Sequence, residues 1–316
     1  MAEEFREWPV YPPRPGLHGP QVTQLYRSSA KDTAMDPKLV ELRAPFVVAI
    51  TGSGKGVGAA IAEAYAHAGA SGILLSSRTL DDLQSMRAQI NTINEKCDVH
   101  FVVCDVTNED ELSNLALECK NRFGRLDVAI INAGVGSKRI KGPDGDQRYP
   151  QGILEDTTAD FFHVWRTNFG GAYLTARAFL PLLRETVDGA QAMVFISSMA
   201  SLHNYTDLTS VSYNISKLAV NRLAEHIHDS YAKDGILTHA IHPGCIRDTD
   251  GHSSSRWHDI MVDDISLPGA FCVWLTQERR DWLSGRYLSA NWDVEKLIED
   301  KEQIVDEDKF KAYLKV

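Results

Sequence analysis

The chain has 316 residues, of which 43% are apolar and 24% charged, and its formal net charge at pH 7 is −10. This composition is typical of a soluble globular protein, and the acidic balance argues against non-specific binding to nucleic acid or to an anionic membrane. No apolar stretch approaches the roughly 18–20 residues that span a bilayer. The start of the chain lacks the basic and apolar segments of a secretory signal. We therefore expect a cytoplasmic protein with neither a membrane nor a nucleic-acid partner.

The first 45 residues contain seven of the twelve prolines and show neither helical nor strand periodicity. We expect residues 1–44 to form an extended arm that lies on the core or on a neighbouring subunit. No glycine- or serine-rich linker interrupts the rest of the chain. Residues 45–316 are therefore predicted to form a single domain.

From residue 46 onward, short apolar runs alternate with amphipathic helical stretches. Near-continuous apolar strands separated by helices indicate a parallel sheet that is covered on both faces. Right-handed crossovers then predict a doubly wound α/β fold of the Rossmann type, with ligands at the carboxyl ends of the strands. The expected strands are 46–51, 73–77, 99–105, 127–133, 192–198 and 237–244.

The turn after the first strand reads GSGKGVG, which contains part of the phosphate-binding loop of nucleotide triphosphatases. That loop needs glycine at position 49 and a hydroxyl residue at position 56, where this chain has Ala49 and Gly56. The spacing of Gly52, Gly56 and Gly58 instead fits a strand–helix turn that holds a dinucleotide pyrophosphate, with Ser53 and Val57 between them. An ordinary glycine-rich turn is the alternative.

Arg78 follows the second strand, where a site for NAD usually carries an acidic residue that binds the ribose. Lys55 lies inside the glycine loop. Two cations at these places favour the 2′-phosphate of NADP(H). The alternative is that both are solvated surface charges.

Polar and small residues follow the next two strands. Asp105, followed by Val106, ends the third strand, where its carboxylate could meet an adenine or instead cap the helix that begins near Asn108. The segment Asn132-Ala133-Gly134 ends the fourth strand and would let a cofactor approach the backbone. Farther along, Tyr213 and Lys217 are four residues apart in an amphipathic stretch (211–233), so they share one face of a helix.

Together, these motifs resemble the short-chain dehydrogenase/reductase family over residues 46–291. The resemblance implies a catalytic tyrosine and lysine at Tyr213 and Lys217, a serine at Ser198 and an asparagine at Asn168. It also implies that Pro243, Gly244 and Ile246 close over the nicotinamide. The tail 285–297 is similar to that of fungal members that serve secondary metabolism.

The chain departs from the family pattern in three places. Ile131 replaces an asparagine before Asn132, and Asp248 stands where a threonine is usual, with Thr249 next to it. Ser198 precedes Tyr213 by two residues more than is common, so a longer loop (202–210) must bring them together. Ser201 and Ser212 are rival hydroxyls for the role of Ser198.

The chemistry of these residues is consistent with the resemblance. A phenol has a pKa of about 10, and the cations of Lys217 and of a nicotinamide are expected to lower it at Tyr213. Tyr213 could then exchange a proton with a carbonyl or alcohol oxygen, to which Ser198 donates a hydrogen bond. Lys217 would also bind the nicotinamide ribose. By analogy with the family, Asn168 would hold a water that connects Lys217 to solvent.

Two irregular segments, 134–153 and 247–265, are expected to recognise the substrate, with Trp257 as a candidate wall. We expect an NADP(H)-dependent oxidoreductase that acts on a carbonyl/alcohol pair of a small molecule. Open alternatives are a redox-neutral dehydratase, isomerase or cyclase, and a module that senses NADP(H) without chemistry. A homodimer or homotetramer that pairs through helices at 160–183 and 212–233 is expected by analogy.

The five cysteines are odd in number and lack the spacing of metal ligands. We expect free thiols in a reducing compartment and no metal site. They are Cys97, Cys104, Cys119, Cys245 and Cys272.

Overall fold

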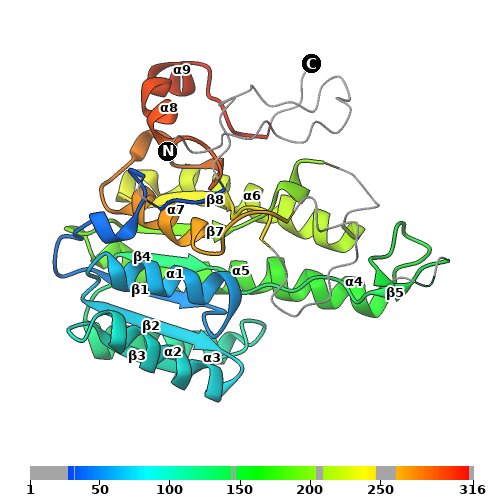
Figure 1. The fold of residues 1–316 in the computed structure, drawn as a ribbon, viewed down its shortest axis with the longest axis horizontal. Coiled ribbons are helices and arrows are strands. Elements are labelled where there is room, and N and C mark those ends of the chain that lie inside the picture. Colours follow the sequence, from blue (N-terminus) through cyan, green and yellow to red (C-terminus); the bar gives the residue numbers. More distant parts are fainter. Residues whose placement is uncertain are drawn as a thin grey trace.

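The structure is a computed structural model, and it describes residues 28–31, 33–143, 145, 147–203, 209–246 and 261–312. Its centre is a sheet of seven strands in the order β3-β2-β1-β4-β7-β8-β9, with every neighbouring pair parallel (Figure 1). The strands are β1 (Val47–Thr51), β2 (Gly72–Ser77), β3 (Asp98–Val103), β4 (Val128–Ile131), β7 (Ala192–Ile196), β8 (Leu237–His242) and β9 (Arg286–Ser289). The predicted doubly wound Rossmann-type fold is confirmed.

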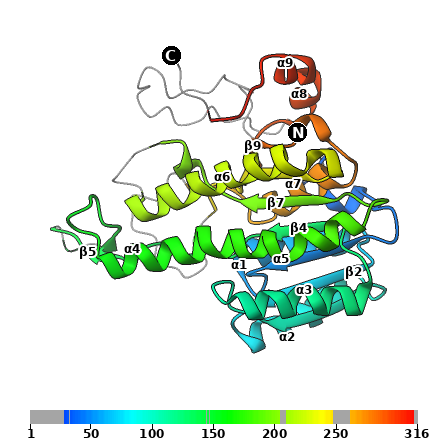
Figure 2. The same ribbon diagram turned by 180° about the vertical axis from the view of Figure 1, so that it is seen from behind.

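Helices cover both faces of the sheet, as Figures 1 and 2 show from opposite sides. One face carries α1 (Gly56–His67), α2 (Leu80–Ile93) and α7 (Leu267–Thr276); the other carries α3 (Glu109–Phe123), α5 (Gly171–Glu185) and α6 (Val211–Tyr231). Strand order reverses between β1 and β4. A ligand crevice is expected at such a reversal, outside the carboxyl ends of the strands.

Shorter elements complete the described chain. They are α4 (Thr158–Trp165), a π-helix (Arg166–Gly170), α8 (Val294–Glu299), α9 (Lys301–Asp306), a hairpin of β5 (Ile140–Lys141) and β6 (Gln147–Arg148), and 3₁₀ turns at Pro37–Leu39, Met199–Ser201, Ala232–Asp234 and Asp281–Leu283. Within the described ranges, no helix is both long enough and apolar enough to cross a bilayer.

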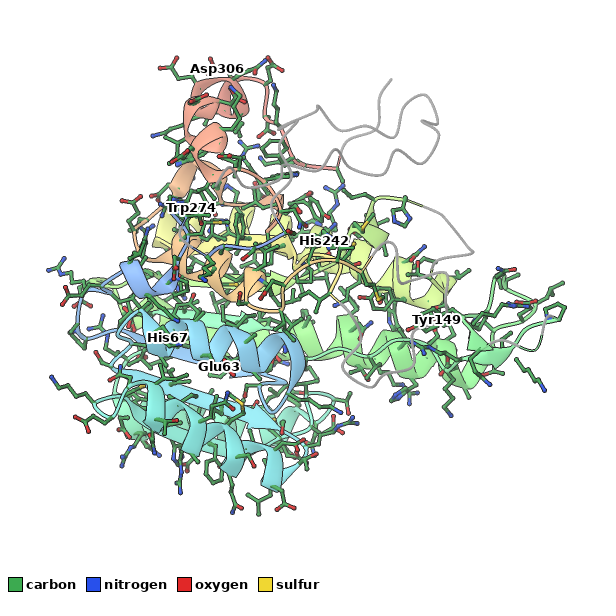
Figure 3. The ribbon with its side chains drawn as sticks, viewed as in Figure 1. Glu63, His67, Tyr149, His242, Trp274 and Asp306 are labelled. Atoms are coloured by element: carbon green, nitrogen blue, oxygen red, sulfur yellow. The ribbon has the colours of Figure 1, made fainter. Side chains whose placement is uncertain are left out.

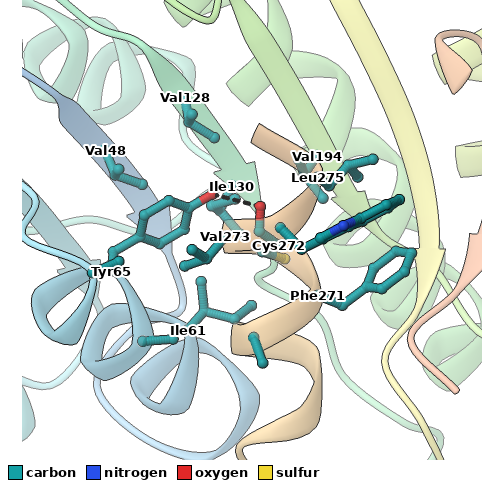
Figure 4. Close-up of a cluster of buried hydrophobic side chains, with 14 of the residues drawn as sticks. Val48, Ile61, Tyr65, Val128, Ile130, Val194, Phe271, Cys272, Val273 and Leu275 are labelled. Carbon is teal, nitrogen blue, oxygen red and sulfur yellow. Dashed lines mark hydrogen bonds between the residues drawn. The ribbon is translucent and has the colours of Figure 1, made fainter. Parts of the chain in front are cut away.

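The core on the α1 face is built where α1 packs on α7 (Figure 4). Tyr65 is fully buried there, and its hydroxyl donates to the carbonyl of Cys272 at 3.2 Å and lies 2.7 Å from Thr276 Oγ1. This partner set satisfies the one polar atom of a large buried ring, so the phenol costs little to bury.

The described part of the proline-rich segment packs on this same core. Ala30, Met35 and Leu42 are buried among the side chains of the α1 face. The backbone of Leu42 donates to Ala68 at 2.9 Å, and that of Asp264 donates to Ser28 at 2.8 Å. Residues 1–27 and 32 of the predicted arm lie outside the described residues.

All five cysteines carry free thiols, and four of them are buried. Burial raises the pKa of Cys97, Cys104 and Cys119 to about 12. These thiols therefore stay protonated and poorly nucleophilic at neutral pH.

Candidate active site

The glycine loop is packed too tightly for side chains at two of its positions. A Cβ added at Gly58 would lie 2.3 Å from the carbonyl oxygen of Gly52, and one at Gly52 would lie 2.9 Å from Cα of Ala133. Asn132 closes the contact from β4, because its Nδ2 donates to the carbonyls of Thr51 and Gly52 at 2.9 and 3.0 Å. Glycine is therefore required here by close backbone packing.

Gly56 has the opposite surroundings. Its φ is +59°, and no atom lies within 4 Å of a Cβ placed there. It is the first residue of α1, whose N-cap Lys55 makes no side-chain capping bond and is exposed, while Val57 packs on the core. A helix N-terminus beside open space suits a pyrophosphate. The geometry therefore fits a bound dinucleotide.

Ser53 contributes to the loop in a different way. It has no exposed surface, and its backbone N–H donates to the carbonyl of Ser76 at 3.0 Å. In return, the N–H of Ser76 donates to Ser53 Oγ at 2.9 Å. Ser53 could therefore act on a cofactor only through the shape of the loop.

A cavity of about 650 Å³ opens at the ends of β2 and β3. Its walls include Arg78 and Asp105 from these strand ends and His163 and Arg166 from the α4 segment. The Asp105 carboxylate accepts from the backbone and hydroxyl of Thr107 at 2.9 and 2.8 Å, and these bonds hold its pKa below the usual value, with Arg78 and His163 adding to the effect. The sides of this cavity are thus more basic than acidic.

The alternative role for Asp105 as a helix cap is wrong, because the side chain of Asn108 caps α3. Val106 is buried and packs so closely on α5 that a Cβ at Gly171 would lie 2.6 Å from its Cγ2. It belongs to the hydrophobic core on this face of the sheet, and its predicted contact with the cofactor stays a prediction.

Tyr213, Ser198 and Lys217 come together at the N-terminal end of α6. Ser210 caps that helix and accepts from the backbone of Tyr213 at 3.3 Å. The side chains of Tyr213 and Ser198 are hydrogen-bonded, so the longer loop between them does bring them together. Lys217 Nζ lies 5.7 Å from the centroid of the Tyr213 ring and donates to the carbonyl of Ile196 at 2.7 Å.

Burial governs the protonation of this group. It raises the pKa of Tyr213 to about 12, while the hydrogen bond to Ser198 acts in the opposite direction. It lowers the pKa of Lys217, a side chain only 5% exposed, to about 8. The protein groups alone therefore move the phenol pKa upward, which is opposite to the lowering expected from the sequence.

Asn168 lies in the π-helix and is 1% exposed. Its Oδ1 accepts from the backbone of Val135 at 2.8 Å, and its Nδ2 donates to the carbonyl of Val135 at 3.0 Å and to Ser216 Oγ at 3.1 Å. A Cβ at Gly134 would lie 3.2 Å from Asn168 Oδ1 and 3.4 Å from Lys217 Nζ. Asn168 thus fixes the chain just beyond the fourth strand, and its water-holding role stays a prediction.

The two rival serines have hydrogen-bond partners other than Tyr213. Ser201 donates to the carbonyl of Ser198 at 2.6 Å and accepts from Asn221 Nδ2 at 2.8 Å. Ser212 lies 2.7 Å from Ser137 Oγ in a buried hydroxyl cluster. The structure therefore leaves Ser198 as the serine hydroxyl that meets the phenol.

Asn221 is a residue of this region that the sequence patterns did not predict. It follows Lys217 by one helical turn, and its amide binds Ser197 and Ser201, which lie on either side of Ser198. The spacing i, i+4 from Lys217 was the available signal. A polar residue on an amphipathic helix is unremarkable by itself, so the signal is weak.

The end of β8 is held by Asp263. Its carboxylate accepts from the backbone N–H of Cys245, and Ile246 forms a parallel bridge with the same residue. Gly244 has a φ of +104°, and a Cβ there would meet Asp263 Oδ2 at 3.0 Å, so only glycine suits the turn after Pro243. Asp248, Thr249 and Trp257, with most of the segment 247–265, lie outside the described residues.

Among the described residues, no group of three or more His, Cys, Asp or Glu side chains is arranged to hold a metal ion.

Comparisons with known proteins agree with this geometry. The family model for short chain dehydrogenases matches residues 46–259. A short chain dehydrogenase of Aspergillus terreus, pgmD, is 35% identical over 88% of this chain and 89% of its own length, and one of Monascus ruber, pigC, is 34% identical over 94% and 95%. The crystal structure of levodione reductase shares the fold, with a TM-score of 0.67 at 22% identity over 78% of this chain and 96% of that one. The motifs, the fold and the relatives lead to one conclusion: this chain belongs to the short-chain dehydrogenase family.

Proposed function

We propose that this oxidoreductase transfers a hydride between NADP(H) and the carbonyl/alcohol pair of a small organic molecule. The observation that carries the proposal is the convergence of Tyr213, Ser198 and Lys217 beside the exposed backbone of Gly134. A phenol and a hydroxyl in contact can bind one oxygen atom and exchange a proton with it, and a nearby ammonium can stabilise the charge that develops.

In the proposed reduction, Tyr213 donates its proton to the substrate oxygen, and Ser198 hydrogen-bonds the same oxygen as negative charge develops on it. NADPH, when bound, supplies the hydride. Lys217 places a positive charge below the Tyr213 ring and is itself anchored by the carbonyl of Ile196. That charge stabilises the phenolate which remains after proton transfer.

Burial raises the pKa of Tyr213 to about 12, so the phenol carries its proton at neutral pH and can donate it to the substrate oxygen in the proposed reduction.

The proposed preference for NADP(H) over NAD(H) is supported by positive charge at the cavity that opens at the ends of β2 and β3. Arg78 and Arg166 are exposed there beside His163, and Lys55 is the N-cap of α1. The nearby carboxylate of Asp105 is engaged by Thr107. Guanidinium groups bind phosphate through paired, charge-assisted hydrogen bonds.

We also propose that subunits pair through α4, α5 and α6, because these helices expose large apolar side chains. Phe162 and Tyr173 are each 48% exposed, and Ile215 and Leu218 are 45% and 44% exposed. Light scattering on the purified protein measures the mass directly, and a monomer at micromolar concentration would contradict the pairing.

The assay that tests the function follows NADPH consumption with a panel of small ketones and identifies the alcohol formed. Tyr213→Phe removes only the hydroxyl, so the protein should still fold and bind NADPH. Turnover should fall by about 10²- to 10⁴-fold, which is the usual contribution of acid–base catalysis. A folded Tyr213→Phe variant with normal turnover would contradict the role of Tyr213 as the proton donor, whereas a wild type that consumes no NADPH with any ketone would favour a redox-neutral reaction.

A further inference from the structure

Two sulfur atoms and an imidazole meet where β7 and β8 end. The Sγ atom of Cys245 lies 3.5 Å from Met199 Sδ and 3.9 Å from His242 Nε2. Met199 begins the 3₁₀ turn that follows β7, and His242 is the last residue of β8. Because β7 and β8 are parallel neighbours, their carboxyl ends bring together side chains that are up to 46 residues apart in the sequence.

The imidazole of His242 is available as a ligand. Its side chain lies well inside the molecule (Figure 3) and is 4% exposed. Nε2 faces the Cys245 thiol, and Nδ1 is buried without a hydrogen-bond partner among the described residues. Burial lowers the pKa of His242 to about 3, so the ring is neutral at neutral pH and carries one nitrogen lone pair.

The two sulfur atoms belong to part-exposed residues. Cys245 and Met199 are both accessible in part, whereas the other four cysteines are buried. Burial of the thiol raises the pKa of Cys245 to about 12, so the free thiol keeps its proton at neutral pH. A metal ion that reaches the thiol can displace that proton, because a coordinating thiol is deprotonated.

The spacing of the three groups suits a single metal ion. With metal–sulfur bonds of about 2.3 Å and metal–nitrogen bonds of about 2.0 Å, as in zinc sites, two ligands of one ion lie roughly 3.5–4 Å apart. The distances from Cys245 Sγ to the other two ligand atoms fall in that range. The set contains a thioether, so it is a different kind of site from a group of His, Cys, Asp or Glu side chains.

The ligand types favour monovalent copper. Thiolate and thioether ligands select Cu(I), and imidazole also suits copper. The single charge of Cu(I) is balanced by one thiolate, so the loaded site is neutral, as a largely buried position requires. Calcium and magnesium prefer oxygen ligands, which this set does not offer.

We propose that Cys245, Met199 and His242 form a binding site for Cu(I), and that the bound ion inhibits the enzyme. On binding, the thiol proton of Cys245 is released to solvent, and the thiolate, the thioether and the imidazole each bond to the ion. Met199 directly follows Ser198, so coordination restrains the hydroxyl that is hydrogen-bonded to Tyr213. The inhibition, unlike the binding, rests on the proposed carbonyl reduction.

The binding test uses the purified protein without NADPH, under reducing conditions that exclude oxygen. Cu(I) bound to a coloured chelator is titrated with protein, and the absorbance of the complex falls as the protein takes the ion. Cys245→Ser should lower the affinity by at least about 100-fold, because even the outer partners of a metal site contribute roughly 10- to 100-fold. Met199→Leu keeps the volume of the side chain and should lower the affinity by roughly 10- to 100-fold.

The matched controls are Cys97→Ser and Met86→Leu, because both residues are buried in the core on the α1 face. Both controls should bind Cu(I) as tightly as the wild type does. A wild type that binds no more tightly than Cys245→Ser overturns the site, and so does a loss for Cys97→Ser as large as that for Cys245→Ser.

X-ray absorption by the copper-loaded wild type tests the ligands without any substitution. The spectrum should contain sulfur and nitrogen neighbours of copper in the ratio two to one. Neighbours that are sulfur alone, or that include oxygen in place of the second sulfur, overturn the proposed ligand set.

The inhibition test follows ketone reduction with NADPH while the chelator sets a rising concentration of free Cu(I). The kcat of the wild type should fall by roughly 10- to 100-fold as the site fills, since a misplacement of about 1 Å in a catalytic group costs about that much. Cys245→Ser should keep its own copper-free turnover. Full occupancy with unchanged turnover overturns the inhibition. A wild type that reduces no ketone without copper contradicts the proposed function instead, and the chelator titration still decides the site.

Discussion

The side-chain amide of Asn168 binds the backbone of a single residue, Val135, at both of its polar groups: it accepts from the N–H at 2.8 Å and donates to the carbonyl at 3.0 Å. This pairing lets an irregular chain segment leave the fourth strand without unsatisfied backbone atoms. It also fixes the distance between Gly134 and Lys217, where the cofactor is expected to approach.

Asn168→Ala would leave both groups of Val135 without partners. We expect the free energy of unfolding to fall by about 1–3 kcal/mol in total, since an unsatisfied buried group costs about that much and the two groups of Val135 are only part-buried. Urea denaturation measures the change. Asn121→Ala, at an exposed site on α3, is the control and should change the free energy by less than about 0.5 kcal/mol. Equal effects of the two variants would contradict a special role for the Val135 contacts.

The pH profile of ketone reduction should report on Lys217. Burial lowers its pKa to about 8, so its positive charge is present below that pH and is lost as the pH rises through it. Because the charge stabilises the phenolate left on Tyr213, kcat should decline above about pH 8. Lys217→Arg keeps the charge at higher pH and should remove the decline, although altered geometry lowers the maximum. A wild-type profile that is flat from pH 7 to pH 10 would contradict this role.

Arg78→Asp should reverse the cofactor preference. It replaces a cation at the cavity wall with an anion, which repels the 2′-phosphate of NADPH and accepts from the ribose hydroxyls of NADH. The dissociation constant for NADPH, measured by fluorescence titration, should rise roughly 10- to 100-fold.

Arg87→Asp makes the same change of charge on α2, where the side chain stacks on Phe101 instead of lining the cavity. It should alter both cofactor affinities only slightly. If Arg87→Asp weakens NADPH as strongly as Arg78→Asp does, the effect comes from net charge and the assignment of Arg78 is wrong.

Gly58→Ala should abolish cofactor binding while much of the fold survives. The added Cβ would lie 2.3 Å from a backbone oxygen of the loop, so the loop must open. The comparison is Gly152→Ala, where no atom lies within 4 Å of the added methyl. Calorimetric titration with NADPH should find no binding for the first variant and normal binding for the second. Normal binding by both would mean that the loop does not hold the pyrophosphate.

Acid should destabilise the protein in part through His239. This side chain is fully buried and its pKa is lowered from about 6.5 to about 4, mainly by burial. Between these values the unfolded chain takes up a proton that the folded chain does not, so stability falls as the pH drops, by about 1.4 kcal/mol per pH unit.

His239→Asn keeps a donor for the carbonyl of Leu283, which lies 3.1 Å from the ring Nδ1. Chemical unfolding at pH 6.0 and 5.0 should show a shallower loss of stability for this variant than for the wild type. The exposed His226→Asn is the control and should retain the wild-type slope. Identical slopes for all three proteins would rule out His239 as a contributor.

The six expected strands were found because each is a near-continuous apolar run, which is what a sheet covered on both faces requires. β9 was not among them, since Arg286–Ser289 is short and opens with an arginine whose guanidinium is bound by chain carbonyls and Asp308. The β5–β6 hairpin has only two residues in each strand, and no pattern can signal so short a pairing.

The spacing of Tyr213 and Lys217 predicted that they share one helix face, while their catalytic roles and that of Ser198 were predicted from the family resemblance. From its cationic neighbours alone, the pKa of Tyr213 was expected to be lowered. Burial, which only the folded structure reveals, proves to be the larger influence.

The reciprocal bonds between Ser53 and Ser76 make the turn after β1 and the end of β2 one mechanical unit. Arg78 is two residues from Ser76. The glycine loop, which would bind the pyrophosphate, therefore cannot shift independently of the end of β2, which would bind the ribose. Redesign of cofactor choice in this scaffold is therefore a matter of exchanging side chains at position 78 and its cavity neighbours. Insertions or deletions between β2 and α2 would change the direction of the chain there. We expect them to disturb the Ser53–Ser76 bonds and to abolish the binding of both NADP(H) and NAD(H).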